Sequence, residues 1–203
     1  MPSIPIRVLA ALVLLVAGLT SCGHSASHAQ TADTTRQPAA HSAADVEFVR
    51  NMIPHHQQAL VLGEMVPART ANPDVRVMAT HISADQQAEI RTLNGLLAAW
   101  GEPVDPPGMS QHDGMPGMPA SGMPMMKGMV DQATLDKLRT LDDEAFDTLW
   151  VTSMIGHHEG AVAMAQDEIA HGQSPDAVHV ATLIVTSQQR EIAMMTHLVS
   201  ATE

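Results

Sequence analysis

The octapeptide MIPHHQQA at residues 52–59 returns as MIGHHEGA at residues 154–161, and this repeat decides the fold. The offset of 102 positions also aligns residues further along the chain, without a gap, over about fifty residues. Pairs that share it include Pro73-Asp74 with Pro175-Asp176, and Gln86-Gln87 with Gln188-Gln189. The chain therefore contains one helical-hairpin unit used twice, and the two copies are expected to pack with pseudo-twofold symmetry.

Each unit is predicted to contain two helices, over residues 43–65 and 73–100 in the first copy and 143–170 and 175–200 in the second. Ser42 and Asp45 form a capping-box pattern at the first start, and Asn72 followed by Pro73 is typical of the second. Pro54 is expected to kink the first helix or break its hydrogen bonds locally. A short helix is predicted over 132–141, and strand signals are absent. The sequence predicts an all-α four-helix bundle.

Helical spacing turns an unusual set of side chains toward the bundle axis. Residues three or four apart share a helix face, which places Met52 with His55 and Met154 with His157, while His56 and His158 lie at the edges of those stripes. The second helix of each unit offers Gln86 and Glu89, or Gln188 and Glu191, at core positions. Burying imidazoles and carboxylates is costly unless they are paired or bind a metal ion.

Three interpretations of these side chains follow. Thioether with imidazole suits copper, above all Cu(I), whereas histidine with glutamate could hold Zn, Fe or Mn. The second interpretation is a structural network of His–Glu and His–Gln hydrogen bonds without metal. The third is a metal-dependent oxidoreductase, but di-iron bundles carry Glu-x-x-His motifs on two helices, and we expect no Glu-x-x-His motif anywhere in this chain.

A methionine-rich segment, PPGMSQHDGMPGMPASGMPMMKGM, separates the two units and holds seven of the fifteen methionines. Its proline and glycine content precludes a long helix, so these side chains cannot form a core stripe. Clustered thioethers suit Cu(I) or Ag(I), and the candidate ligands are Met115, Met118, Met123, Met126, Met129 and His112. A low-complexity linker and a sacrificial antioxidant segment are the alternatives.

The N-terminal residues are typical of an exported protein. Arg7 precedes an apolar run that is shorter than a membrane span and fits a secretory signal. The run ends in Leu19-Thr20-Ser21-Cys22, which resembles a bacterial lipobox, so Cys22 is a predicted lipidation site. We therefore predict a signal peptide over 1–21, a flexible tether over 22–42 and a bundle domain over 43–203, with the methionine-rich loop at 102–130. Because the formal net charge is −12, we do not expect a nucleic-acid partner.

The stretches FVRNMIPHHQQALVLGEM and LWVTSMIGHHEGAVAMAQ, each followed by QQ-x-E-I, resemble family 305 of the domains of unknown function. The resemblance covers residues 43–199 and implies a ferritin-like four-helix bundle, usually exported, with some copper-linked members. It implies functional roles for the repeated residues, namely Met52, His55, His56, Gln86, Glu89, Met154, His157, His158, Gln188 and Glu191.

Together these observations predict a lipoprotein on the extracytoplasmic side of the cell membrane that binds copper, without catalysis, for sequestration or tolerance. The predicted ligands are the repeated methionine, histidine and glutamate residues together with those of the loop. The sequence does not indicate whether the halves share one central site or build two, nor an oligomeric state.

Overall fold

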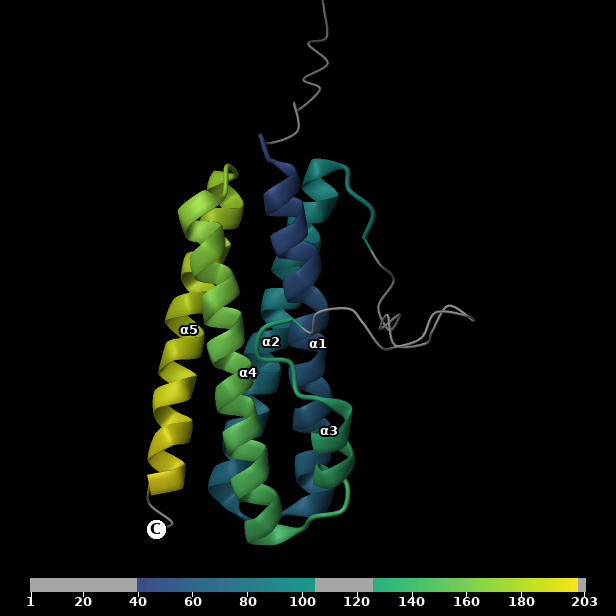
Figure 1. Ribbon diagram of the computed structural model, residues 1–203, viewed down its shortest axis with the longest axis vertical. Coiled ribbons are helices and arrows are strands. Elements are labelled where there is room, and N and C mark those ends of the chain that lie inside the picture. Colours follow the sequence, from purple (N-terminus) through teal and green to yellow (C-terminus); the bar gives the residue numbers. More distant parts are fainter. Residues whose placement is uncertain (1–39, 105–125, 201–203) are drawn as a thin grey trace, which may run out of the picture. The chain divides into compact units, whose positions relative to one another are not determined.

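The computed structural model describes residues 40–104 and 126–200, and within them every regular element is a helix. The elements are α1 (Ala43–Arg69), α2 (Pro73–Trp100), α3 (Gln132–Leu138), α4 (Asp143–His171) and α5 (Pro175–Ser200). Figure 1 shows the four long helices running side by side, with the short α3 beside the lower part of the bundle. The predicted all-α four-helix bundle is confirmed.

The helix starts follow the predicted capping residues. The Ser42 side chain accepts from the backbone of Asp45, and the Asp45 side chain accepts from the backbone of Ser42, so the capping box is complete. Asn72 accepts from the Asp74 N–H at 3.0 Å, and Pro73 opens α2, where its missing N–H costs nothing. Gly101 ends α2 in the left-handed conformation, with φ of 75°, which glycine adopts without strain.

Three helix ends differ from the predictions. α1 continues through Pro67 to Arg69, and the buried Val66 holds this last turn against the core despite the missing N–H of the proline. Pro54 likewise lies inside a helix that is not interrupted there. α3 ends at Leu138, three residues early, and α4 continues one residue further to His171, before Gly172.

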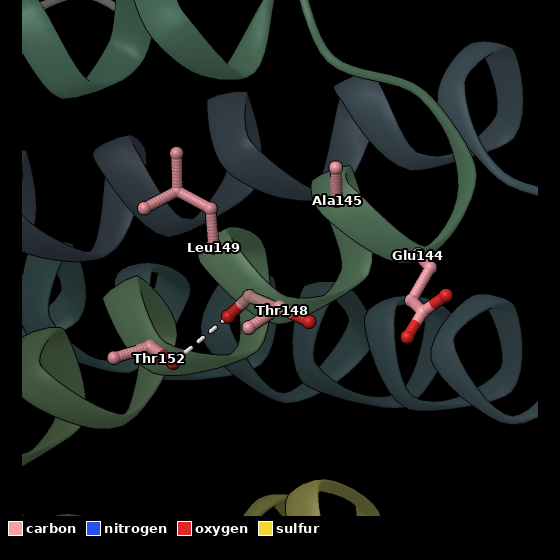
Figure 2. A pocket seen from close by; sticks show the side chains of 5 residues that line it. All are labelled: Glu144, Ala145, Thr148, Leu149 and Thr152. Carbon is pink, nitrogen blue, oxygen red and sulfur yellow. Dashed lines mark hydrogen bonds between the residues drawn. The ribbon is translucent and has the colours of Figure 1, made fainter. Parts of the chain in front are cut away.

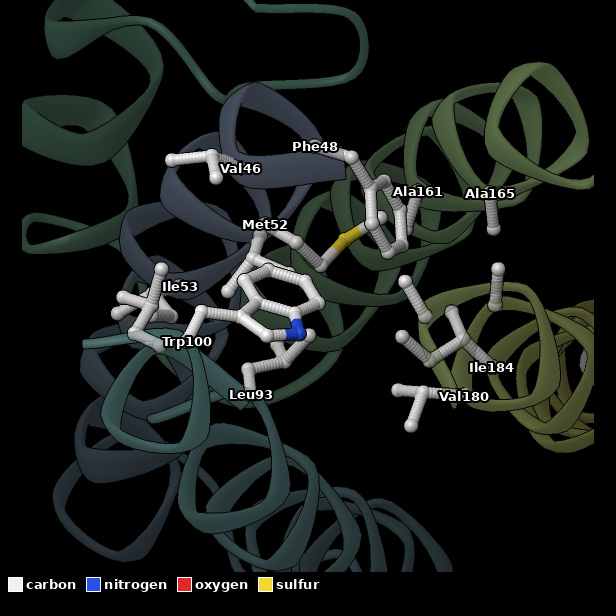
Figure 3. Packing of buried hydrophobic residues seen from close by; sticks show 14 residues of the cluster. Val46, Phe48, Met52, Ile53, Leu93, Trp100, Ala161, Ala165, Val180 and Ile184 are labelled. Carbon is white, nitrogen blue, oxygen red and sulfur yellow. The ribbon is translucent and has the colours of Figure 1, made fainter. Parts of the chain in front are cut away.

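Each long helix packs mainly against two of the other long helices. α1 packs against α2 and α4, and α5 packs against α4 and α2, so each hairpin lies against its copy. The buried hydrophobic side chains form two separate clusters, and both draw on all four long helices. The first cluster contains Phe48, Met52, Leu93, Trp100 and Ile184 (Figure 3). The second contains Leu62, Ile82, Phe146, Trp150 and Met154, together with Leu135 and Leu138 of α3.

Matching hydrogen bonds tie the two hairpins together at both ends of the bundle. Asp45 of α1 accepts from the backbone N–H groups of Gln173 and Ser174 at 2.8 and 3.0 Å, where α5 begins. Asp147, 102 positions after Asp45, accepts from the side chain of Asn72 at 2.9 Å, where α2 begins. The first helix of each unit thus holds the start of the second helix of the other unit.

Residues 127–130, which we call the strap, cross the bundle just before α3 (Figure 1). Gln58 binds both backbone groups of Val130, donating to its carbonyl at 2.9 Å and accepting from its N–H at 2.8 Å. The strap also lies directly on the α4 backbone: a Cβ atom at Gly160 would overlap the Lys127 carbonyl, and one at Gly128 would lie 2.8 Å from the Gly160 Cα atom. The two glycines permit this contact.

Within the described residues, no helix has the length and apolar character needed to cross a membrane. The predicted signal peptide, Cys22 and most of the tether lie outside those residues, as do His112, Met115, Met118 and Met123 of the loop. His41, which the sequence analysis assigned to the tether, instead stacks on Trp100 with ring centroids 4.7 Å apart.

Candidate metal centre

A buried polar layer separates the two hydrophobic clusters. Its core is the four repeated histidines, His55, His56, His157 and His158, none of which is more than 1% exposed. The two glutamines of the second helices, Gln86 and Gln188, are equally buried. All six side chains were predicted to face the axis or to lie at its edge, and burial of His56 and His158 is more complete than their edge positions indicated.

The outer histidine of each motif is paired with a glutamate one helix away. His56 Nε2 lies 2.7 Å from Glu89 Oε2, and His158 Nε2 lies 2.7 Å from Glu191 Oε2. A carboxylate only accepts hydrogen bonds, so each imidazole carries its proton on Nε2. The carboxylates thereby fix both the tautomer and the orientation of these rings.

The inner histidines are held by backbone carbonyls instead. His55 Nε2 donates to the Lys127 carbonyl of the strap at 3.0 Å, and His157 Nε2 donates to the His55 carbonyl at 3.0 Å. The two rings lie against each other, with centroids 3.8 Å apart and planes 33° apart. The strap therefore takes part in the polar layer as well as in the connection between the hairpins.

Burial keeps the inner rings neutral. Loss of hydration, reinforced by the charge of His56, lowers the pKa of His55 to about 3, although the Lys127 carbonyl opposes this. Burial and the neighbouring His55 also lower the pKa of His157 well below its usual value. At neutral pH both rings are therefore uncharged, with one nitrogen free of a proton.

Among the described residues, the second nitrogen of every ring has no hydrogen-bond partner. Nδ1 of His55, His56, His157 and His158 is buried and makes no hydrogen bond among the described residues, and the same holds for both amide atoms of Gln86. Histidines that bind metals through one nitrogen usually donate the other N–H to a carboxylate or a backbone carbonyl. All four rings have that outer arrangement, and the neutral inner rings of His55 and His157 each offer a lone pair on Nδ1 inside the bundle.

The two glutamates differ in exposure. The Glu191 side chain is 2% exposed and that of Glu89 is 17% exposed. Burial would raise the pKa of Glu89, but hydrogen bonds from His56 and Ser187 outweigh it and hold that pKa below its usual value. Ser187 donates to Glu89 Oε1 at 2.7 Å, so both oxygens of this carboxylate are bonded.

The soft candidate ligands lie on either side of the layer. Met52 belongs to the first hydrophobic cluster and Met154 to the second, and both are fully buried. Met126 and Met129 of the methionine-rich segment are half-buried at the strap, which joins that segment to the polar layer through the bond from His55.

Sequence reasoning missed two residues beside this layer, His81 and Asp85 of α2, which lie close to Glu191 of α5. Their spacing of four places them on one helix face and on the same stripe as Glu89, which was the available signal. Their approach to Glu191 depends on how α2 and α5 pack, which spacing within one helix does not reveal.

The expectation that this chain has no Glu-x-x-His motif is wrong, because the motif occurs once, at Glu168 and His171. The two side chains do not form a site. Glu168 is buried beside Asp45, whereas His171 is exposed and bonds the Asp167 carbonyl at 3.0 Å. The matching position of the first unit carries Val66, so the paired motif of di-iron proteins is missing.

The outer face of α4 forms a shallow pocket, lined by Glu144, Ala145, Thr148, Leu149 and Thr152 (Figure 2). All five residues come from one helix, and the Thr152 hydroxyl donates its hydrogen bond to the Thr148 carbonyl. Convergent polar groups from several elements, which small-molecule sites use, are not found here. The polar layer is the stronger candidate.

Comparison with known proteins agrees with this architecture. A fragment of a DUF305 protein from Deinococcus radiodurans is 30% identical, with a TM-score of 0.67, and the match covers 81% of this chain and 99% of that one. A putative secreted DUF305 protein from Streptomyces coelicolor is 31% identical, with a TM-score of 0.64 over 78% and 93% of the two chains.

CopM in its Cu(II)-bound form is 29% identical, with a TM-score of 0.62 over 78% of this chain and 97% of that one. CopM is also similar in Cu(I)-bound and Ag-bound forms. An uncharacterized protein, L153 of Acanthamoeba polyphaga mimivirus, is 36% identical over 53 residues, or 26% of this chain, and the match spans only 35% of that protein. The model of the domain of unknown function DUF305 matches residues 45–199, and the chain therefore belongs to the DUF305 family.

Proposed function

We propose that this protein is an exported lipoprotein that binds copper, mainly Cu(I), for sequestration or tolerance and without catalysis. Cys22 would carry the lipid anchor on the extracytoplasmic side of the membrane. The metal would be held by the repeated histidines and methionines of the bundle and by the methionine-rich loop.

One observation carries the proposal for the bundle. Four buried imidazoles have their Nε2–H groups satisfied by carboxylates or carbonyls, while all four Nδ1 atoms lack a partner among the described residues. A purely structural network would bond both nitrogens, since an unsatisfied buried acceptor is costly. Neutral imidazole beside the thioethers of Met52 and Met154 is a donor set that suits Cu(I).

In this proposal the glutamates orient the rings. Glu89 and Glu191 each already accept the Nε2–H of a histidine, which is the outer role that carboxylates take around metal-bound imidazoles. The inner pair, His55 and His157, is the closest pair of rings in the layer and the first choice for a shared ion.

Similarity to CopM, whose structures hold Cu(I), Cu(II) or silver, supports copper as the cargo. The methionine-rich segment adds soft ligands, and we propose that it captures Cu(I) near the polar layer. Met126 precedes the strap and Met129 lies within it, so metal captured there would be bound next to Lys127, whose carbonyl accepts the hydrogen bond from His55.

Titration of the full chain with Cu(I) under reducing, anaerobic conditions, against a competing chelator, tests the bundle site. We expect at least one tightly bound ion per chain. His157→Gln should weaken that site by about tenfold or more, because it removes a ligand, whereas His179→Gln on the exposed face of α5 should change nothing. Less than one ion per chain, or equal affinities for both variants, would contradict copper binding in the bundle.

The loop is tested separately by replacing Met109, Met115, Met118, Met123 and Met125 with serine. We expect fewer Cu(I) ions per chain but an unchanged bundle site, since none of these residues is a ligand proposed for the bundle. An unchanged stoichiometry would refute the role of the loop and leave the bundle proposal standing.

A further inference from the structure

The seam between α2 and α5 carries a second, chemically different group of candidate ligands. His81 Nδ1 lies 3.4 Å from Asp85 Oδ2 and 3.4 Å from Glu191 Oε1. One donor atom from each of the three residues lies within 4.8 Å of the others, an arrangement that the four central histidines and their glutamates do not reach among the described residues.

The distances suit a metal ion better than hydrogen bonds. A separation of 3.4 Å is long for a charge-assisted hydrogen bond, which is usually 2.7–2.9 Å. Around a tetrahedral ion with bonds of about 2.0–2.2 Å, however, neighbouring ligand atoms lie about 3.3–3.6 Å apart. Both distances from His81 fall within that range.

The group is anchored at one side and open at the other. The Glu191 side chain is 2% exposed, and its Oε2 accepts the hydrogen bond from buried His158. Its Oε1 is therefore left to face His81 at the seam. The side chains of His81 and Asp85 are 54% and 45% exposed, so an ion could enter from solvent and keep a water ligand. A fixed inner carboxylate with accessible outer ligands is a geometry that binds metal without rearranging the core.

The second unit of the repeat lacks these ligands at the positions that match His81 and Asp85. Residues 102 positions after His81 and Asp85 are Leu183 and Ser187, and Ser187 satisfies the matching Glu89 with a neutral hydroxyl at 2.7 Å. Glu191 instead faces an imidazole and a second acid. The first unit therefore departs from the repeat by adding two metal-binding side chains at one point.

We propose that His81, Asp85 and Glu191 form a site for a divalent transition-metal ion, of which Zn(II) is the simplest probe. One imidazole and two carboxylates form a borderline-to-hard donor set without sulfur, which favours Zn(II) or Cu(II) over Cu(I). The site is separate from the Cu(I) site proposed for the polar layer, although Glu191 borders both.

Zn(II) binding to the full chain, measured by isothermal titration calorimetry, tests the site. His81→Leu with Asp85→Ser copies the residues of the other half, so the fold should tolerate it, as helicity by circular dichroism would verify. We expect the loss of one Zn(II) site or a fall in its affinity of about 100-fold, because two of three ligands are removed. Unchanged Zn(II) binding would overturn the proposal and would indicate an ion-paired cluster alone.

A converse variant gives an independent test. Leu183→His with Ser187→Asp should build the same group around Glu89 and add one Zn(II) site per chain. If it adds none, the residue set is insufficient and the proposal is wrong. Cu(I) binding of both variants should equal that of the unmodified chain, so failure at the seam is distinguishable from failure in the polar layer.

Discussion

Glu89 and Glu191 occupy matching positions of the repeat and bind matching histidines, but they stand in different surroundings. Glu89 is partly exposed and keeps a second hydrogen bond from Ser187. Glu191 is almost completely buried, and within residues 40–104 and 126–200 its short hydrogen bond comes from His158 alone. The same substitution in the two halves should therefore have unequal costs.

We predict that His158→Leu lowers the free energy of unfolding by about 3 kcal/mol, since it leaves a buried carboxylate without its main partner. His56→Leu should cost about 1 kcal/mol, because Glu89 retains water and Ser187. Urea unfolding of the metal-free variants measures both values. Equal losses would show that the difference in burial has no energetic consequence.

At the residue level, the sequence predicted which side chains enter the core but not what they bind. Spacing within a helix placed His55 and His157 toward the axis, as found. The partners of their Nε2 atoms are backbone carbonyls, including that of Lys127 in a segment 72 residues away from His55. Helical periodicity contains no information about such a contact.

At the element level, the strap is held by close backbone packing as well as by hydrogen bonds. Gly160 lies directly beneath Lys127 and Gly128, whereas Gly156, one turn earlier on α4, has open space around the position of a Cβ atom. The two glycines thus form a matched pair for testing the contact.

We predict that Gly160→Ala destabilises the protein by about 1–3 kcal/mol, because the added methyl group overlaps backbone atoms that cannot rotate away. Gly156→Ala should raise stability by about 0.5–1 kcal/mol through helix propensity. Thermal unfolding of both variants compares them. A stable Gly160→Ala variant would show that the strap is not seated on α4.

Helix boundaries were predictable where the sequence contains a capping residue, and less so elsewhere. Ser42, Asn72 and Gly101 marked their helix ends correctly. Pro67 misled, because α1 ends where its packing ends and not where a hydrogen-bond donor is missing. The strap itself was predicted only as part of a loop, since its position depends on α1 and α4 together.

At the scale of the whole molecule, a buried acid pair links the two hairpins and should make stability depend on pH. Burial, with the neighbouring charge of Asp45, raises the pKa of Glu168 from 4.5 to about 8. Between these values the folded chain holds a proton that the unfolded chain has released, so the free energy of unfolding falls as pH rises. Burial would raise the pKa of Asp45, but hydrogen bonds from Ser174 and Ser42 outweigh it and lower that pKa. Asp45 therefore makes the free energy of unfolding rise with pH, and only at acid pH.

We predict that Glu168→Gln, which cannot ionise, gains stability relative to the unmodified protein by at least about 1 kcal/mol between pH 5 and pH 8.5. Urea unfolding of the metal-free unmodified protein and of the variant, at several pH values, gives the free energy of unfolding of each against pH. The contribution of buried His55 is the same in both and cancels in their difference. A difference that does not vary with pH would contradict the raised pKa.

The global arrangement was the most predictable feature, because a duplicated hairpin of apolar periodicity has few ways to bury its faces. The ties of Asp45 and Asp147 to the opposite hairpin were not predicted. The sequence alignment paired these two acids, but only the packed bundle reveals that each reaches across to the start of the other unit's second helix.

Because the polar layer divides the apolar interior into two clusters, repacking near Phe48 need not be compensated near Phe146. Substitutions in separate clusters should combine additively. Related chains could therefore drift in sequence at each end of the bundle independently, while the histidine layer between them stays under its own constraint.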